Sequence, residues 1–592
     1  MHLPIIKGSN SYKKSIVAFG GINFSRSFSE GELSECTGIS HISFPSLTQR
    51  RKSETLFECS APTALIFADK ECFVTDTELY YDRKKVADLN TGKKCISFLG
   101  KKIVVFPDKL FYDTQTEETG FLQAEASSDG ANAKFTTAEI IFPEIYEKEV
   151  SVVERLEFER NFSVISYMSV TSKDAKLSFS GFKLKKVSDI SEGDFLGEKC
   201  EANQYRRVIS VQEDSEGKNC IVETELISIE NPMKNIFSQF KAGDVVEISG
   251  CTFSSANNRT AEIASVEGNK LVFSVEVFKA GEEMSSVTIK RKIPNFSCVC
   301  SYENRLWGCE GNTIYASKLG DMTNFFVYKN LSTDSYSVMS NTPGDFTACI
   351  PYGNCCLFFK EDRCYKLYGN RPSNFHLTES FGCGILQEDA GSLINVNGTV
   401  FYKGSGGVYT YYGGTPVCVS QKLDGLLMEN TVSGSDGKCY YISADTKEGR
   451  EEFVWDMEKN LWSKSGINDV IAYCSHKGEV YRLRPFGIEK VIDEPDGEAS
   501  WSITLCPFDE GYYKTKNYSR LYINVHLYEN AFIQTEVSRD EGAWESINIC
   551  HADEKKHISI PCVVKSCHSI KLRFSGKGKC MLESITREFS VN

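Results

Sequence analysis

One short pattern of strands and turns is written three times between Pro294 and Gln421, and it constrains the fold more than any other feature. Each copy is an apolar run, a polar turn, a second apolar run, another turn and a third run. The turns carry Glu-Asn, Gly-Asn or Asn-Gly, which tolerate the positive φ angles of tight hairpins. The pattern predicts three antiparallel meanders, which begin at Asn295, Thr347 and Ser392.

Four further copies of the pattern lie on either side of these three. They cover residues 64–81, 95–112, 438–462 and 471–483. Self-similarity at roughly 40 to 50 residues, with several short strands per copy, is typical of a β-propeller built from radially packed four-stranded sheets. We therefore predict an all-β chain with a propeller of about seven blades. A β-sandwich made of ordinary hairpins is the alternative interpretation of the same runs.

Changes in the pattern of strands and turns along the sequence predict that the chain has five segments. They are an N-terminal arm at 1–52, a first propeller part at 53–160, an inserted β-barrel-like domain at 161–293, a second propeller part at 294–492 and a C-terminal β-sandwich at 493–592. In the insertion, Gly193-Asp194 and Gly243-Asp244 each form a turn that runs into a strand, which favours a small barrel. Blades with long loops are the alternative. Alternating apolar residues predict that the arm adds a strand to a neighbouring sheet.

Composition narrows the functional classes. With 80 acidic and 67 basic residues, the chain of 592 residues carries a formal charge of −13, which disfavours a sequence-independent grip on nucleic-acid phosphates. The 27 Tyr and 38 Phe suit pleated, half-buried surfaces. We expect no secretory leader and no membrane insertion, because no apolar run approaches the length of a span. The 23 Cys are therefore predicted to be reduced and to act as small buried hydrophobes.

Two motifs carry residues that chemistry would need. The run from Ser538 to Trp544 is similar to the Asp-box of propeller glycosidases, but it is one residue short, and we interpret it as a hairpin turn packed by the Trp. A Cys/His cluster has ligand types that suit zinc, but strand alternation predicts that its side chains point to opposite faces. Its members are Cys550, His551, His557, Cys562, Cys567 and His568.

Motifs for nucleotide binding, zinc hydrolysis and a Ser nucleophile do not occur in the sequence. We therefore assign no catalytic, cofactor-binding or metal-ligating residue, expect no cofactor and predict that the chain is not an enzyme.

Five passages resemble the tail-nozzle (tail tubular or hub) proteins of short-tailed bacteriophages and related prophage minor structural proteins. They are Gly21-Ile-Asn23 with Phe44-Pro45-Ser-Leu-Thr-Gln-Arg50, the Asn304-Arg-Leu-Trp307-Gly line, Thr313 to Phe325, Phe358 to Phe375, and Tyr402 to Ser420. Together they span residues 20–420, and it is their order that carries the resemblance.

The resemblance implies a virion structural protein, made in the host cytoplasm, in which an interrupted propeller assembles as a homo-oligomeric ring, typically a hexamer. Such rings join the portal, adaptor or other tail proteins and form a conduit that DNA passes through as cargo. The family offers no catalytic residues to carry over. The alternative prediction is a glycan- or receptor-binding tail-tip protein that stacks sugars on Tyr409, Tyr411 and Tyr412 or on the terminal sandwich.

Overall fold

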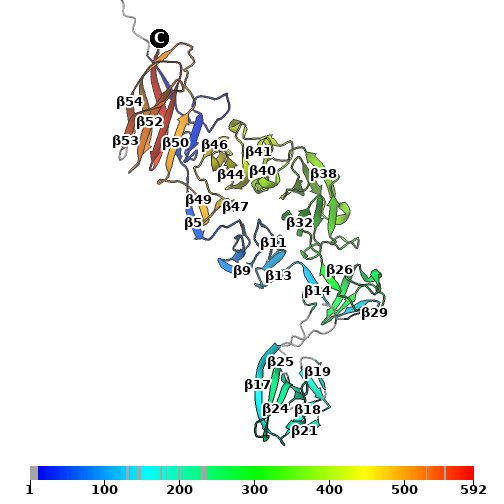
Figure 1. The fold of residues 1–592 in the computed structure, drawn as a ribbon. Coiled ribbons are helices and arrows are strands. Elements are labelled where there is room, and N and C mark those ends of the chain that lie inside the picture. The colour runs from blue at the N-terminus through cyan, green and yellow to red at the C-terminus, as the bar shows by residue number, and fades with distance from the viewer. Residues whose placement is uncertain are drawn as a thin grey trace, which may run out of the picture. The chain divides into compact units, whose positions relative to one another are not determined.

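The computed structural model describes residues 11–592 except 129–131, 143–148, 168, 174–175, 182, 198–200, 203, 229–235, 529 and 552–554. The described chain is nearly all β and forms many small sheets (Figure 1). It divides into two compact units. Unit 1 comprises Met1–Leu122 and Ile293–Asn592, and unit 2 comprises Gln123–Lys292. The described 3-10 turns are η1 (Val187–Asp189), η2 (Ser255–Asn257), η3 (Pro372–Asn374), η4 (Gln387–Ser392) and η5 (Gln421–Leu423).

Among its described residues, unit 1 contains seven antiparallel four-stranded sheets, numbered in chain order. Sheets 1 to 3 are β6 (Ala64–Phe67), β7 (Glu71–Val74), β8 (Glu78–Tyr81) and β9 (Lys84–Asp88); β10 (Cys95–Leu99), β11 (Lys102–Phe106), β12 (Leu110–Asp113) and β13 (Thr119–Phe121); and β31 (Cys298–Tyr302), β32 (Arg305–Glu310), β33 (Thr313–Ala316) and β34 (Tyr336–Met339).

Sheets 4 to 6 also use consecutive strands, whereas sheet 7 takes its last strand from the N-terminal segment. They are β35 (Ala348–Tyr352), β36 (Cys355–Phe359), β37 (Cys364–Tyr368) and β38 (His376–Phe381); β39 (Ile394–Val396), β40 (Thr399–Gly404), β41 (Gly407–Tyr411) and β42 (Val417–Cys418); β43 (Glu429–Ser435), β44 (Cys439–Thr446), β45 (Gly449–Asp456) and β46 (Leu461–Lys464); and β47 (Ala472–His476), β48 (Glu479–Arg484), β49 (Gly487–Pro495) and β5 (Arg51–Glu58).

Each of the seven sequence repeats lies in a separate one of these sheets. The first strands contact one another in the order β6, β10, β31, β35, β39, β43, β47 and β6 again, so the order of the sheets closes on itself. Each neighbouring pair of sheets buries apolar side chains between its faces. The hairpin turns have the predicted positive φ, for example 52° at Asn304, 55° at Gly353 and 51° at Asn397.

A β-sandwich completes unit 1. Its strands from the C-terminal segment are β50 (Ser500–Leu505), β51 (Lys516–Leu527), β52 (Phe532–Arg539), β53 (Trp544–His551), β54 (Lys555–Cys567), β55 (Ile570–Lys577) and β56 (Cys580–Val591). Four strands of the N-terminal segment join them, which are β1 (Ser11–Ile16), β2 (Leu33–Thr37), β3 (Ile39–Ser40) and β4 (Leu47–Gln49).

The arm therefore contributes more than the single added strand that the sequence predicts. β2 pairs with β50 at the edge of the five-stranded sheet, while β1 and β4 both pair with β56 in the six-stranded sheet. Phe19, Ile22 and Leu33 of the arm are fully buried in the shared core. Residues 1–52 and 493–592 were separate parts in the prediction, but their described residues build one sandwich, and β5 continues from it into sheet 7.

The described residues of unit 2 form two hydrophobic cores. One belongs to an eight-stranded sheet of β14 (Ala124–Ser127), β15 (Ala133–Phe135), β16 (Glu139–Ile141), β26 (Val245–Ser249), β27 (Thr260–Glu267), β28 (Lys270–Phe273), β29 (Gly281–Glu283) and β30 (Thr288–Arg291). The other belongs to β17 (Glu149–Glu159), β18 (Ser163–Tyr167), β21 (Lys183–Lys186), β22 (Phe195–Leu196), β24 (Gln204–Glu213) and β25 (Asn219–Ser228), beside a small sheet of β19 (Ser169–Lys173), β20 (Lys176–Ser180) and β23 (Glu201–Ala202).

The two predicted Gly-Asp turns are present and have the same geometry. Gly193 and Gly243 adopt φ of 90° and 89°, and the Asp that follows each accepts a hydrogen bond from a backbone N–H three residues earlier in the chain. Unit 2 begins at Gln123 instead of residue 161, because β14 pairs with β30 and β16 pairs with β28. These short strands, of which only β14 is Ala-rich, acquire their place from partners far along the chain, which the local pattern does not reveal.

Candidate functional site

A cavity of about 880 Å³ lies where the first strands of the seven sheets begin. Residues of six of the seven sheets line it, and sheet 5 is represented by Leu393 and the η4 turn, which directly precede β39. Its lining includes the charged residues Asp76, Lys93, Lys94, Glu388, Asp445, Arg450 and Asp469. This volume is within the range of about 300 to 1,000 Å³ that is usual for small-molecule sites.

Several charged groups of the cavity are held by neighbours. Arg450 Nη1 lies 2.8 Å from Asp445 Oδ1, and Asn430 Nδ2 donates to the other carboxylate oxygen at 2.9 Å. Burial alone raises the pKa of Asp445, but these two donors lower it below its ordinary value. Asp469 binds both ends of the Arg484 guanidinium, at 2.7 and 2.9 Å. These contacts link β43, β44 and β45 to one another and tie Asp469 to β48.

The pKa shifts of the described carboxyl groups all have the same direction. Wherever the pKa of an Asp or Glu is shifted, it is lowered, as at Asp445, Glu283 and Asp493. A glycosidase general acid needs the opposite shift, since it must stay protonated near neutral pH. The absence of an enzymatic role remains a prediction.

A second cavity, of about 420 Å³, lies between sheets 7 and 1 and has an aromatic wall. Phe73 and Tyr80 stack with ring centroids 4.6 Å apart, and Phe57 packs on Phe73 at 4.7 Å. The guanidinium of Arg83 lies over the Phe57 ring, and Glu78 accepts from the Tyr80 hydroxyl. Aromatic faces beside charged groups are suited to ligands that are part apolar and part hydroxylated.

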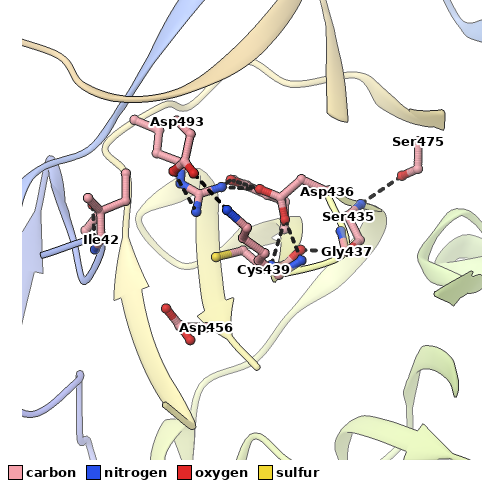
Figure 2. A network of polar contacts seen from close by, with 12 residues as sticks. Ile42, Ser435, Asp436, Gly437, Cys439, Asp456, Ser475 and Asp493 are labelled. Atoms are coloured by element: carbon pink, nitrogen blue, oxygen red, sulfur yellow. Dashed lines mark hydrogen bonds and ion pairs between the residues drawn. The ribbon is translucent and has the colours of Figure 1, made fainter. Parts of the chain in front are cut away.

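Arg51 of β5 is the centre of a polar network that ties sheet 7 to sheet 6. It pairs with Asp436, donates to the Tyr441 hydroxyl at 2.9 Å and lies 3.2 Å from Asp493. We call these contacts the arm clasp. Figure 2 shows Asp436 in the turn between β43 and β44, where its other oxygen accepts the N–H of Cys439 at 2.7 Å.

The arm clasp is largely withdrawn from solvent, because the side chains of Arg51 and Asp436 are only 9% and 12% exposed. Burial alone lowers the pKa of Arg51, but Tyr441 and the surrounding acidic groups raise it above its ordinary value. The guanidinium therefore stays charged. A planar donor of this kind can serve three acceptors at once, which suits it to holding a strand that enters from far away in sequence.

Sheets 6 and 7 are also joined by a buried ion pair. Glu452 accepts from Arg482 Nε at 2.6 Å and from Nη2 at 2.9 Å, and the Tyr473 hydroxyl donates to it at 2.6 Å. Arg482 Nη1 reaches Ser53 of β5 at 3.0 Å. Because both charged side chains are at most 2% exposed, loss of either partner would leave the other uncompensated.

The structure places both sequence motifs in the C-terminal sandwich. Asp540 and Glu541 adopt positive φ in the turn between β52 and β53, and Trp544 stacks under Arg573 at 3.9 Å, in agreement with the hairpin interpretation. The Cys/His cluster alternates as predicted. Its buried members are Cys550, Cys562 and Cys567, and its exposed members are His551, His557 and His568. The part of the chain that the structure describes contains no group of three or more Cys, His, Asp or Glu arranged to hold a metal ion.

The aromatic run proposed to stack sugars is only partly available. Tyr411 is fully buried and Tyr409 half-buried, whereas Tyr412 is 65% exposed. No helix within the described residues is long and apolar enough to cross a membrane. The sequence patterns did not identify the role of Arg51, although the passage from Phe44 to Arg50 ends beside it. They also did not identify the ion pair of Glu452 with Arg482. An isolated charged residue in a strand does not indicate which residue will be its partner.

Comparison with known proteins gives no family. No family model matches the chain, and no curated protein matches it. Among solved structures, an exo-β-1,3-galactanase from Phanerochaete chrysosporium is 9% identical, covers 50% of this chain and 96% of its own and has a TM-score of 0.20. The extracellular domain of a one component system from B. thetaiotaomicron is 9% identical over 92% of this chain and 95% of its own, with a TM-score of 0.24.

PorZ of the type-IX secretion system of Porphyromonas gingivalis is 8% identical, covers 92% of this chain and 95% of its own and has a TM-score of 0.24. TM-scores this low carry no argument about fold or function.

Proposed function

We propose that this protein is a structural component of a bacteriophage tail or neck, a nozzle- or hub-like ring that surrounds the path of DNA out of the capsid. We infer that the seven sheets are the blades of one β-propeller. The closed order of the first strands supports this, and so does the completion of sheet 7 by β5, since a propeller must join its last blade to its first.

The observation that carries the proposal is the place of unit 2 in the chain. The chain leaves unit 1 after β13 and returns before β31, and Leu122 and Ile293 are buried in the same cluster. Lys109 Nζ also donates to the Ile293 carbonyl at 2.7 Å. Because the strands described in unit 2 take no part in the seven sheets, unit 2 is available to contact neighbouring subunits. An interrupted propeller is what the resembling tail-nozzle proteins use to assemble.

The partners follow from the same role. Copies of this chain form a homo-oligomeric ring, with a hexamer as the expected number, and the ring joins portal, adaptor or other tail proteins. The formal charge of −13 suits a conduit, because DNA passes as cargo and is not held by its phosphates. The expected location is the virion tail, after synthesis in the bacterial cytoplasm.

Electron microscopy of the purified protein, and of particles produced with it, tests the proposal. We expect rings or tubes with rotational symmetry, and the same protein in purified virions by mass spectrometry. A protein that stays strictly monomeric at high concentration and is absent from virions would refute the assembly role.

A second candidate is a glycan- or receptor-binding tail protein, and the cavity of about 420 Å³ favours it. Its stacked Phe73 and Tyr80 provide a face for a sugar ring, and Glu78 and Arg83 provide polar partners. Binding of the full chain to a glycan array, lost in Tyr80→Ala and kept in Tyr412→Ala, would support this role. Equal binding by both variants, or none by the wild type, would remove it.

A further inference from the structure

Five free cysteines form a continuous chain of sulfur contacts between sheets 3 and 4. The contacts run from Cys309 to Cys298, on to Cys349, then to Cys300 and finally to Cys356. The Cys300 and Cys356 Sγ atoms are 3.5 Å apart. Cys298, Cys300 and Cys309 belong to sheet 3, while Cys349 and Cys356 belong to sheet 4, so the chain of thiols crosses the interface three times.

Two adjacent inner members of this arrangement line a cavity, whereas both of its ends are buried. Cys298 and Cys349 both line the cavity of about 880 Å³, whereas Cys309 and Cys356 are completely buried. Cys298 begins β31 and Cys349 lies in β35, two neighbouring first strands that contact each other. A small molecule in the cavity therefore reaches a thiol from each of two adjacent sheets.

We propose that Cys298 and Cys349 are a peroxide-sensitive pair that closes into a disulfide between sheets 3 and 4. The two residues belong to neighbouring strands in contact and line the same cavity, an arrangement in which a disulfide can join the two strands. The assignment does not depend on the role in phage assembly.

The two thiols have different electrostatic environments. Cys298 accepts S–H hydrogen bonds from Cys309 and Cys349, and these lower its pKa although burial opposes them. The same contact with Cys298 raises the pKa of Cys349. Because the thiolate is the nucleophile, Cys298 reacts first and Cys349 second.

The chemistry balances with hydrogen peroxide as the oxidant. The Cys298 thiolate attacks one peroxide oxygen, the O–O bond breaks, and hydroxide leaves and takes up a proton to become water. The Cys349 sulfur then attacks the sulfenic acid, so that the S–S bond forms, the S–O bond breaks and a second water leaves with the remaining proton. Two thiols give up two electrons, and the protein loses two hydrogen atoms.

Peptide mapping of the full chain tests the assignment. After brief treatment of the reduced protein with hydrogen peroxide and blocking of the remaining thiols, non-reducing mass spectrometry should find one major cross-link, between the peptides that carry Cys298 and Cys349. We expect a rise in Tm of at least about 4 °C, reversed by dithiothreitol, because the cross-link constrains the unfolded chain. A link between Cys300 and Cys356 alone, or none, would overturn the assignment.

Three variants separate the roles of the two thiols. Cys349→Ser should leave Cys298 as a sulfenic acid that dimedone traps, and Cys298→Ser should abolish both the cross-link and the trapping. Cys72→Ser is the matched control, since Cys72 is a fully buried thiol of the second strand of sheet 1, and it should keep the wild-type cross-link. If Cys298 in the folded wild type reacts no faster with iodoacetamide than Cys349, the nucleophile has been assigned wrongly.

Discussion

The seven sheets of unit 1 and the sheets of unit 2 differ in the range of the contacts that close them. In unit 1, Arg482 donates to Ser53, 429 residues away in sequence, and sheet 7 gains its fourth strand only because β5 pairs with β49. In unit 2, the buried pair of Arg291 with Asp244 spans 47 residues. Unit 1 therefore depends on contacts between its N-terminal and C-terminal segments, while unit 2 is closed by contacts among residues 123–292. We expect the two units to unfold independently.

The largest effect should come from the buried pair between sheets 6 and 7. Glu452→Ala leaves the buried guanidinium of Arg482 charged and without its carboxylate partner, and we expect it to destabilise unit 1 by about 3 to 5 kcal/mol. Hydrogen exchange should rise in sheets 6 and 7 and stay unchanged in unit 2.

Asp244→Ala is the matched variant, because it breaks an equally buried pair in unit 2. It should raise exchange in β26 and β30 and leave the seven sheets protected. If either substitution destabilises both units to the same extent, the two are energetically one body and the comparison fails.

A smaller effect should follow when the arm clasp is broken. Arg51→Met removes hydrogen bonds to a charged group that is 9% exposed, and we expect a loss of about 1.5 to 3 kcal/mol, measured by urea unfolding. Lys438→Met removes a neighbour of Asp493 whose side chain is 73% exposed, and solvent screens that contact, so its effect should be much weaker. Equal effects would mean that Arg51 acts only as one more surface charge.

Acid should weaken unit 2 through Glu283 of β29. Burial alone raises the pKa of this carboxyl group, but hydrogen bonds from Thr252, Ser285 and the Phe253 N–H lower it from 4.5 to about 2. Because the folded pKa is lowered, the stabilisation is complete above pH 4.5 and is lost as the pH falls toward 2. Hydrogen exchange in unit 2, measured while the pH is lowered, should show this loss of stability in the wild type. Glu283→Gln should be flatter across the same window.

The repeats were predictable because their information is local. Asn304, Gly353 and Asn397 stand where a hairpin needs positive φ, and the structure has it at each of them. The placing of β5 and the start of unit 2 were not predictable, because the strands involved pair with partners hundreds of residues away or with short strands that look like loops. A strand carries its own alternation but not the identity of its neighbour.

The candidate sites divide in the same way. The alternation of Cys562 and His557 followed from strand periodicity, and the structure has it. The clustering of Cys298 with Cys349 was hidden, since each reads alone as a small buried hydrophobe, and only the contact of two first strands brings them together.

The smallest effect on the stability of unit 1 should come from the deletion of unit 2, although this deletion removes the most residues. Deleting residues 123–292 and joining Leu122 to Ile293 by a short Gly-Ser linker should leave the Tm of unit 1 within about 2 °C of its wild-type value, since the ends share one cluster and closing a short loop costs little. Calorimetry should then record one transition where the full chain gives two.

Glu452→Ala should lower the free energy of unfolding of unit 1 by the same amount in the shortened chain as in the full chain, because the effects of distant sites are additive. A shortened chain that does not fold would show that unit 2 supports the seven sheets, whereas one that folds but forms no rings would place the intersubunit contacts in unit 2.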